Sequence, residues 1–315
     1  MYKLIRFYNQ NRKQIIKISI IIVFIICMIQ ILNYLSKNET NNNSLNNQIT
    51  NSIVDNKKEL ISDKSAISGK IISESKLQKD TEIIDKFITY CNQKDITNAY
   101  NLLTDECKEV MFPTIQDFYN IYYSKIFEEG NKTYTLENWN ENTYTVRITG
   151  DILSTGGLDI NNTKHDYMTI VKQDGKKKLN VNNYIGRSNS NKENTYKNIK
   201  VTVNTIDTYF DYEIYDLTIE NNSNNTILLD TSDDTKSVYL LDNKDMKYYF
   251  YNNEIIDNRL KVKSQFKTNL KIKFMNKYSS TRTIESLVFS KVVLDYNEYK
   301  NNENFDKFDT LTVNL

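Results

Sequence analysis

The feature that most constrains this chain is an apolar run near its N-terminus, ISIIIVFIICMIQIL, which extends from Ile18 to Leu32. With its flanks the run covers residues 15–35. A helix of about 20 residues, rising about 1.5 Å per residue, crosses a hydrocarbon core of about 30 Å. The sequence therefore predicts a transmembrane helix, anchored in lipid by side chains that include Ile18, Ile22, Phe24, Ile29 and Leu32.

Charges around this run predict its orientation. Lys3, Arg6, Arg12, Lys13 and Lys17 lie before or at its start, and no acidic residue precedes Glu39. Because positive charge favours the cytoplasmic side, we expect residues 1–14 to be a cytoplasmic basic tail and the later domains to be extracellular. A cleaved signal peptide is the alternative. However, residues 33–43 contain no small-x-small pattern, and Cys27 follows two isoleucines, unlike a lipoprotein signal.

Composition indicates a folded extracellular region on a polar tether. Apolar residues make up 39% of the chain and aromatic residues 12%. Residues 36–77 are rich in Asn, Ser and Lys, and we expect a flexible linker there. Five of the 41 basic residues lie in the N-terminal arm, so the remaining 36 face 40 acidic residues. This balance argues against nucleic acid as a partner, because phosphate binding needs a basic excess.

The pattern of residues 78–187 predicts an α+β domain. Apolar residues from Ile83 to Cys91 recur at three- and four-residue spacings, which is typical of a helix. A second short helix follows Asp95, and a third helix or extended turn begins at Pro113 and ends at Gly130. After Gly130 the apolar residues alternate, which predicts a curved meander of about four antiparallel strands covered by the helices.

The same segment resembles the nuclear-transport-factor-two-like domains of membrane-anchored Gram-positive proteins. Three short motifs carry the likeness: Lys94 with Asp95, then Ala99, Tyr100, Leu102 and Leu103, then Phe118 with Tyr119. The resemblance implies an α+β cone. Proteins of this architecture include the TcpC-like scaffold subunits of conjugation machines, which carry an N-terminal anchor and two such domains outside the cell.

The C-terminal part departs from that pattern. A polar break at residues 188–195 is expected to be a linker, and residues 196–315 contain seven or eight alternating runs separated by Asn, Asp and Ser turns. This pattern predicts an all-β sandwich. It resembles the immunoglobulin-like modules of exported bacterial proteins, although the cysteines and tryptophan of antibody domains are absent.

No residue pattern in the chain predicts catalysis. The one histidine, His165, stands in a polar segment that we expect to be a solvated loop. Asp85 and Asp117 are expected on exposed helix positions, and Tyr100 and Tyr119 in the core. We therefore expect no enzyme, no catalytic residue and no cofactor or metal. An enzyme or small-ligand receptor that uses the pocket of the cone is the alternative.

Three further groups of residues leave alternatives open. Asp230, Asp233 and Asp234 suggest either a calcium-binding loop or a solvated acidic turn. Cys91 and Cys107 form either a disulfide or two buried thiols. In the run Tyr248, Tyr249, Phe250 and Tyr251, alternate side chains of a strand point to opposite faces, so two aromatic residues should face solvent.

This aromatic run is the candidate partner surface, with an aromatic cluster beneath a loop as the alternative. Taken together, these features favour a bitopic, non-catalytic scaffold or binding module of the cell envelope, for example in conjugation or secretion machinery. Its expected partners are membrane lipid and an envelope protein, and self-association is left open.

Overall fold

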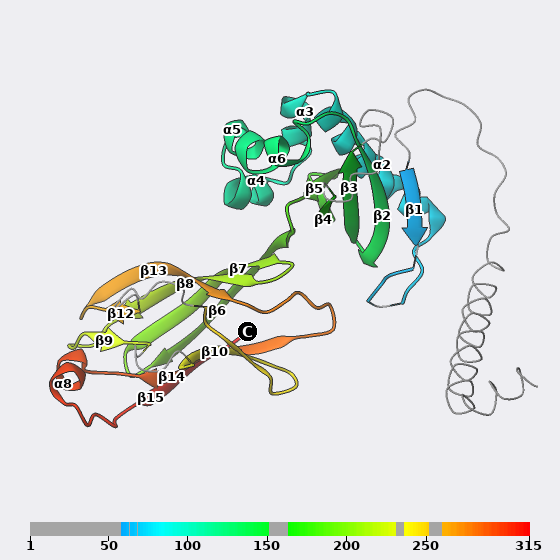
Figure 1. The fold of residues 1–315 in the computed structure, drawn as a ribbon. Coiled ribbons are helices and arrows are strands. Elements are labelled where there is room, and N and C mark those ends of the chain that lie inside the picture. Colours follow the sequence, from blue (N-terminus) through cyan, green and yellow to red (C-terminus); the bar gives the residue numbers. More distant parts are fainter. Residues whose placement is uncertain (1–57, 63, 68, 151–162, 231–235, 252–259) are drawn as a thin grey trace, which may run out of the picture. The chain divides into compact units, whose positions relative to one another are not determined.

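A computed structural model of the chain describes residues 58–62, 64–67, 69–150, 163–230, 236–251 and 260–315. These residues form mostly β-strands and a few helices, so the predicted β-rich architecture is confirmed (Figure 1). None of their helices is both long enough and apolar enough to cross a bilayer. The predicted tail, 1–14, and anchor, 15–35, lie outside the described residues.

The helices of the N-terminal part begin where a short polar side chain caps the free backbone N–H groups. Ser73, Asp95, Thr104 and Thr114 each accept a hydrogen bond from the backbone N–H three residues later. The helices are α2 (Glu74–Asn92), α3 (Ile96–Asn101), α4 (Asp105–Met111), α5 (Ile115–Phe118), the π-helix η2 (Tyr119–Tyr123) and α6 (Ser124–Ile126).

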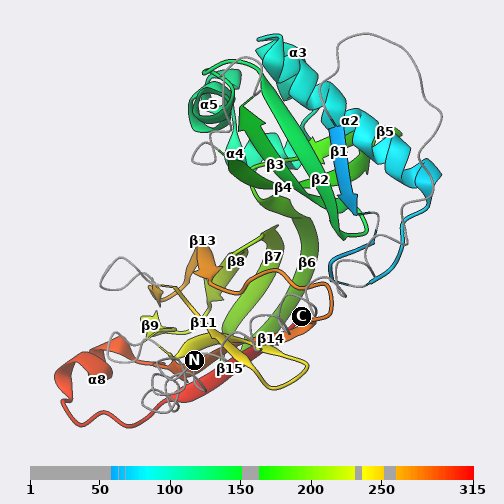
Figure 2. The ribbon, with the colours of Figure 1, turned by 45° about the vertical axis from the view of Figure 1, so that its right-hand side comes forward.

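A five-stranded sheet accompanies these helices. Its strands are β1 (Lys58–Ser62), β2 (Lys132–Asn140), β3 (Thr143–Gly150), β4 (Lys164–Gln173) and β5 (Lys176–Asn180), and they lie side by side in this order. β1 pairs with β2 in parallel, whereas the other neighbours are antiparallel. Helix α2 runs along one face of the sheet (Figure 2).

Aromatic side chains fill the space between these helices and the sheet. Phe87 of α2, Phe112, Phe118 of α5 and Tyr122 of η2 are fully buried, and their contacting ring centroids lie 5.4–6.2 Å apart. Alternate residues of β2 and β3, such as Leu136 and Val146, complete this core from the sheet. The interior is therefore packed with large side chains.

The C-terminal part is built from antiparallel strands around a second core. One sheet has the order β13-β8-β7-β6 and another the order β11-β10-β14-β15. Both sheets contribute to one cluster that includes Val201, Leu217, Phe274, Leu240 and Phe289. The elements are β6 (Tyr184–Tyr196), β7 (Ile199–Tyr209), β8 (Glu213–Asn221), β9 (Ile227–Leu228), β10 (Val238–Asp242), β11 (Lys247–Tyr249), β12 (Lys261–Val262), β13 (Phe266–Phe274), β14 (Ile284–Val292), α8 (Tyr296–Asn301) and β15 (Asp309–Asn314).

Two segments that were expected to be linkers contain regular structure. Residues 188–195 lie within β6, which pairs with β7 over most of its length. In the expected linker 36–77, residues 58–62 form β1 and α2 begins at Glu74; residues 36–57 lie outside the described residues. Polar strands carry little alternation of apolar residues, so their pairing with a neighbour, and not their own pattern, places them in a sheet.

The first core also contains residues of the second group of strands, from the start of β6 and the end of β7. Tyr184 of β6 and Tyr209 of β7 are buried in the first core. Nearby, Arg187 of β6 binds both carboxylate oxygens of Asp207 at 2.8 and 3.0 Å, and it also binds Glu109 of α4 at 3.1 Å. The bidentate geometry fixes the guanidinium between the two strands and the helix.

An aromatic cluster also joins side chains from the two groups of strands. Trp139 of β2, the one tryptophan of the chain, contacts Tyr167, Phe210 and Tyr278 with ring centroids 5.1–5.3 Å apart. Tyr167 and Phe210 are stacked at 3.6 Å. Since Tyr167 belongs to β4 and Phe210 follows β7, side chains of the two sheets meet in this cluster.

Candidate functional site

The aromatic run at residues 248–251 lies on and just after β11, and its side chains alternate between two faces. Phe250 is 8% exposed and packs in the second core, with Tyr248 partly buried against it. Tyr249 and Tyr251 are 38% and 40% exposed. Tyr249 and Tyr251 are therefore the outward pair, and Tyr248 and Phe250 are the inward pair.

Specific contacts hold the inward pair in place. The Tyr248 hydroxyl donates a hydrogen bond to Asp242 Oδ2 at 3.0 Å, and the Arg282 guanidinium lies 4.8 Å from the centre of its ring. Phe250 packs edge-on against Phe274 with ring centroids 6.4 Å apart. Its backbone N–H donates to Val238 O of β10. These contacts fix the direction in which Tyr249 and Tyr251 point.

Lysines and further tyrosines surround the outward pair. Tyr239 stands opposite Tyr249 on β10, with ring centroids 6.0 Å apart. Lys247 Nζ lies 4.4 Å from the Tyr239 ring centre, and Lys236 Nζ lies 5.6 Å from that of Tyr249. At such distances an ammonium group is attracted to the face of the ring.

The same arrangement continues onto β13. The backbone N–H of Tyr251 donates to Lys273 O, and Lys273 Nζ lies 5.7 Å from the Tyr251 ring centre and 3.6 Å from that of Tyr212. We call this surface the tyrosine–lysine face. It comprises Tyr212, Tyr239, Tyr249, Tyr251, Lys236, Lys247 and Lys273.

Sequence reasoning found only the aromatic run of this face. The hairpin between β10 and β11 offers one signal for another member, because Val238 and Leu240 are buried and Tyr239 between them must point outward. Lys273 of β13 and Tyr212, which lies between β7 and β8, are distant in sequence from the hairpin, so no local pattern could have joined them to the face.

Buried carboxylates in the first core are satisfied by fixed donors. Asp166 Oδ2 accepts from the Tyr122 hydroxyl at 2.6 Å, and its carboxylate also accepts from the backbone N–H groups of Asn182 and Asn183. Burial raises the pKa of Asp166, and burial beside this carboxyl raises the pKa of Tyr122 well above its usual value. Both groups are enclosed, so they hold the fold together and offer no base to a substrate.

The other acid–base candidates are scattered. His165 is an exposed residue of β4, paired across the sheet with Arg147, and not a loop residue as expected. Asp85 is not a free surface group, because it accepts from the buried Tyr134 hydroxyl at 2.9 Å. Asp117 caps α5. Hence the structure brings none of these residues together around a common point.

The two remaining tyrosine candidates stand at the edge of the core. Tyr100 packs against it with a hydroxyl that donates to Phe112 O at 2.9 Å. Tyr119 also packs against the core, and its hydroxyl reaches Glu128 at 3.0 Å. Both are thus partly buried packing residues, in line with the expectation of core aromatics.

Neither a disulfide nor a metal centre is found among the residues that the structure describes. Cys91 and Cys107 are buried free thiols, so the disulfide alternative is wrong. Burial raises the pKa of both, to about 12 for Cys107. Asp230 accepts a hydrogen bond from Ser237, whereas Asp233 and Asp234 lie outside the described residues. No cluster of metal-ligating side chains occurs in the described part of the chain.

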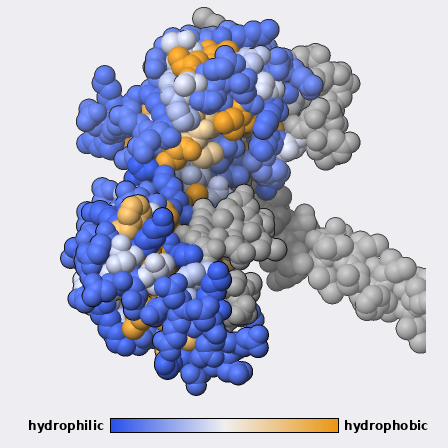
Figure 3. All heavy atoms as spheres, turned by 90° about the vertical axis from the view of Figure 1, so that its left-hand side faces the viewer, coloured by the Kyte–Doolittle hydropathy of each residue, from blue (hydrophilic) through white to orange (hydrophobic). Residues whose placement is uncertain are grey.

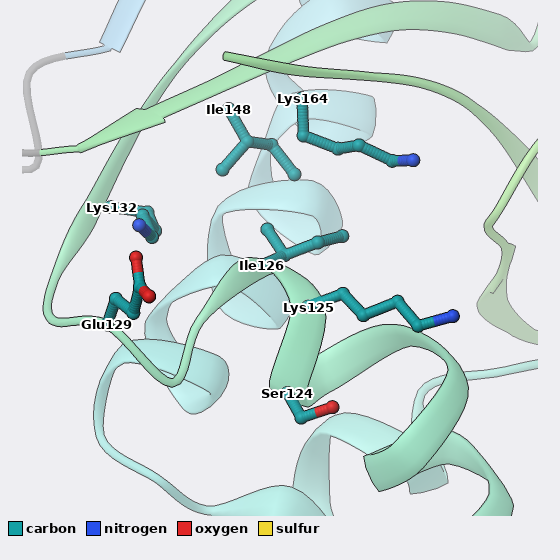
Figure 4. Close-up of a pocket in the computed structure, with 7 residues that line it drawn as sticks. All are labelled: Ser124, Lys125, Ile126, Glu129, Lys132, Ile148 and Lys164. Atoms are coloured by element: carbon teal, nitrogen blue, oxygen red, sulfur yellow. The ribbon is translucent and has the colours of Figure 1, made fainter. Parts of the chain in front are cut away.

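A small pocket of about 250 Å³ opens between α6, β2 and the neighbouring strands (Figure 4). In the close-up, Lys125 and Lys164 extend in the same direction, while Glu129 and Lys132 point toward each other. Ile126 and Ile148 form its apolar wall. Glu129 faces Lys132 and not Lys125 or Lys164, so the lining aims no carboxylate at a point shared with those two lysines.

Figure 3 shows mainly hydrophilic surface on the face in view, with hydrophobic residues in separate patches. The face in view therefore offers a partner mainly polar and aromatic contacts. It does not present a single broad apolar patch. The sequence matches no protein-family model, and searches of curated proteins and of solved structures likewise found no match.

Proposed function

We propose that the chain is a bitopic, non-catalytic scaffold of the cell envelope, whose tyrosine–lysine face binds an envelope protein with an acidic surface. In this proposal residues 15–35 anchor the chain and the later residues lie outside the cell. Residues 78–187 form a nuclear-transport-factor-two-like cone, and residues 196–315 form an immunoglobulin-like sandwich. The layering of α2 on a curved sheet and the two sheets around one core support these assignments.

One observation carries the binding role: Tyr249 and Tyr251 are 38% and 40% exposed while the side chains between and before them are held in the core. Tyrosines bury a large area and lose little conformational entropy when they are held rigidly, so they are frequent hot spots of interfaces. Lys236, Lys247 and Lys273 around them favour a partner that carries acidic groups.

A photo-crosslinking amino acid placed at position 249 or 251 tests this role in intact cells. We expect one defined adduct at each position, and we expect Lys247→Glu with Lys273→Glu to remove it by reversing the complementary charge. The same crosslinker at Phe266, which is 54% exposed on β13, is the matched control.

Each outcome is decisive for the proposed surface. An adduct with a second copy of this chain would show that the face mediates self-association and does not bind a different envelope protein. Equal adducts at all three positions, or adducts that survive the charge reversal, would contradict it. The double variant Tyr249→Ser, Tyr251→Ser should change the free energy of unfolding by less than about 1 kcal/mol, since surface substitutions are mild.

A further inference from the structure

A second and larger concave site lies at the start of α2, where the β4–β5 hairpin approaches that helix. Its volume is about 490 Å³. Four lysines line it, and we call it the lysine groove. Its lining comprises Lys76, Lys79, Lys172 and Lys177 together with Asp80, Ser73, Ser75, Asn142, Ile170 and Gly175.

A buried carboxylate builds the floor of this groove. The side chain of Asp80 is 4% exposed and accepts from Lys76 Nζ at 2.8 Å, from Lys177 Nζ at 2.5 Å and from the Tyr144 hydroxyl at 2.9 Å. Burial alone would raise the pKa of Asp80, but these hydrogen bonds outweigh it and lower the pKa. Asp80 is therefore ionised and holds two ammonium groups at fixed positions.

The lysines of the groove differ in how many of their N–H groups are already hydrogen-bonded. Lys76 Nζ also donates to Glu141 O and to Asn142 Oδ1, so its three N–H groups are occupied. Because Asn142 accepts through Oδ1, its amide N–H₂ group remains for another acceptor. Lys177 Nζ has one carboxylate partner, and Lys79 and Lys172 are exposed. Four lysines face one carboxylate in the lining, which leaves an excess of positive charge.

These features point to the class of ligand. An excess of ammonium groups with an amide and two serine hydroxyls suits a phosphate group, which offers several acceptor oxygens. Ile170 and the methylene stems of the lysines supply the apolar part of the lining, which can cover the carbon skeleton of a small ester. A volume of this size is in the range of small-molecule sites. We infer that the lysine groove binds the phosphate ester of a small polyol, through Lys79, Lys172 and Lys177.

Binding to the full-length chain in phosphatidylcholine nanodiscs tests this inference. Glycerol 3-phosphate and inorganic phosphate are the soluble probes, followed by calorimetry. Flotation with phosphatidylglycerol vesicles, against phosphatidylcholine vesicles, shows whether the same chemistry is recognised on a lipid headgroup. We expect glycerol 3-phosphate to bind more tightly than inorganic phosphate and to be displaced by salt.

A pair of double variants separates this site from general charge attraction. Lys79→Gln with Lys172→Gln removes two positive charges from the groove and should weaken binding at least about tenfold, the equivalent of about 1.4 kcal/mol. Lys125→Gln with Lys164→Gln removes two exposed charges from the smaller pocket of Figure 4 and should leave binding unchanged.

Equal weakening by the two double variants, or no binding of either soluble probe at millimolar concentration, would overturn the inference. Binding of phosphatidylglycerol vesicles without binding of glycerol 3-phosphate would show that the groove contacts a membrane surface. It would overturn the inference that the ligand is a soluble polyol ester. The four substituted lysines are exposed, so we expect both double variants to fold. Unchanged circular dichroism spectra would then exclude unfolding as the cause of weaker binding.

Discussion

Tyrosine hydroxyl groups that donate to carboxylates recur throughout the described residues. A buried hydroxyl needs an acceptor, and an ionised carboxylate is the strongest acceptor that a side chain offers. Eight such pairs occur: Tyr119–Glu128, Tyr122–Asp166, Tyr134–Asp85, Tyr144–Asp80, Tyr184–Asp207, Tyr196–Asp309, Tyr215–Glu213 and Tyr248–Asp242. Five of these carboxylates, those of Asp80, Asp166, Asp207, Glu213 and Asp242, are buried, so a tyrosine hydroxyl can hold an acidic residue within a core.

Tyr122→Phe should lower the free energy of unfolding by about 1–3 kcal/mol, because it removes one of the three donors that satisfy the fully buried Asp166. Tyr119→Phe is the matched control, since its partner Glu128 is exposed and can be hydrated. We expect a change below about 0.5 kcal/mol for the control. Urea unfolding measures both, and equal losses would show that the burial of Asp166 does not matter.

Such pairs could not be predicted from the sequence. Asp85 and Tyr134 are separated by 49 positions, and nothing in either local pattern distinguishes this aspartate from Asp117, which instead caps α5. Periodicity places Tyr134 on the buried face of a strand, but the identity of its acceptor depends on how α2 lies on the sheet. The partner is a tertiary property.

At the scale of helices and strands, Asp80 ties α2 to β3 and β5. It accepts from Lys177 of β5 and Tyr144 of β3 as well as from Lys76 of its own helix. The pKa of Asp80 is lowered from its ordinary value of 3.8 in the folded chain. A lowered pKa means that the unfolded chain takes up the proton first as the pH falls.

Asp80 therefore contributes stability that is present above pH 3.8 and is lost as the pH falls through its lower folded pKa. We expect Asp80→Asn to cost about 2 kcal/mol at neutral pH, and this difference from the natural chain should shrink in acid. Asp174→Asn, in the exposed turn of the β4–β5 hairpin, is the control, and we expect it to change the free energy of unfolding by less than about 0.5 kcal/mol at neutral pH. Unfolding curves between neutral and acidic pH measure both, and a constant difference for Asp80 would contradict its ionised role.

Periodicity predicted the strongly patterned elements and missed the polar ones. The helix around Ile84 to Ile88 and the strands around Val146 and Leu217 have one apolar face each, and the structure contains them. By contrast, β1 and the second half of β6 carry mostly polar residues, so no apolar face marks them. Their pairing with β2 and β7 supplies the hydrogen bonds that define them as strands.

For the molecule as a whole, topology is the prediction most open to test. Protease added to intact cells should degrade the part beyond residue 36, whereas a tag on the N-terminus should stay protected, because the basic tail is expected in the cytoplasm. Immunoblots of the tag and of a C-terminal epitope measure this, with permeabilised cells as control. A mature chain recovered from the medium and beginning near residue 37 would instead show a cleaved signal.

Residues 78–187 and 196–315, the two domains predicted from the sequence, share contacts around β6 and β7. A cut between them would divide β6 and separate Arg187 and Tyr184 from Asp207. It would also remove Tyr209 from the first core. The two parts are therefore coupled by side chains that neither fragment would contain in full.

The position of Trp139 gives this chain a spectroscopic reporter of that coupling. It is the one indole, and its ring lies among Tyr167, Phe210 and Tyr278, drawn from both groups of strands. The indole is half-buried, so its emission maximum and its quenching by small solutes change when these rings move and water reaches it. An unlabelled sample in a fluorimeter can thus signal when the strands around β4 and β7 separate, whether ligand, partner or proteolysis is the cause.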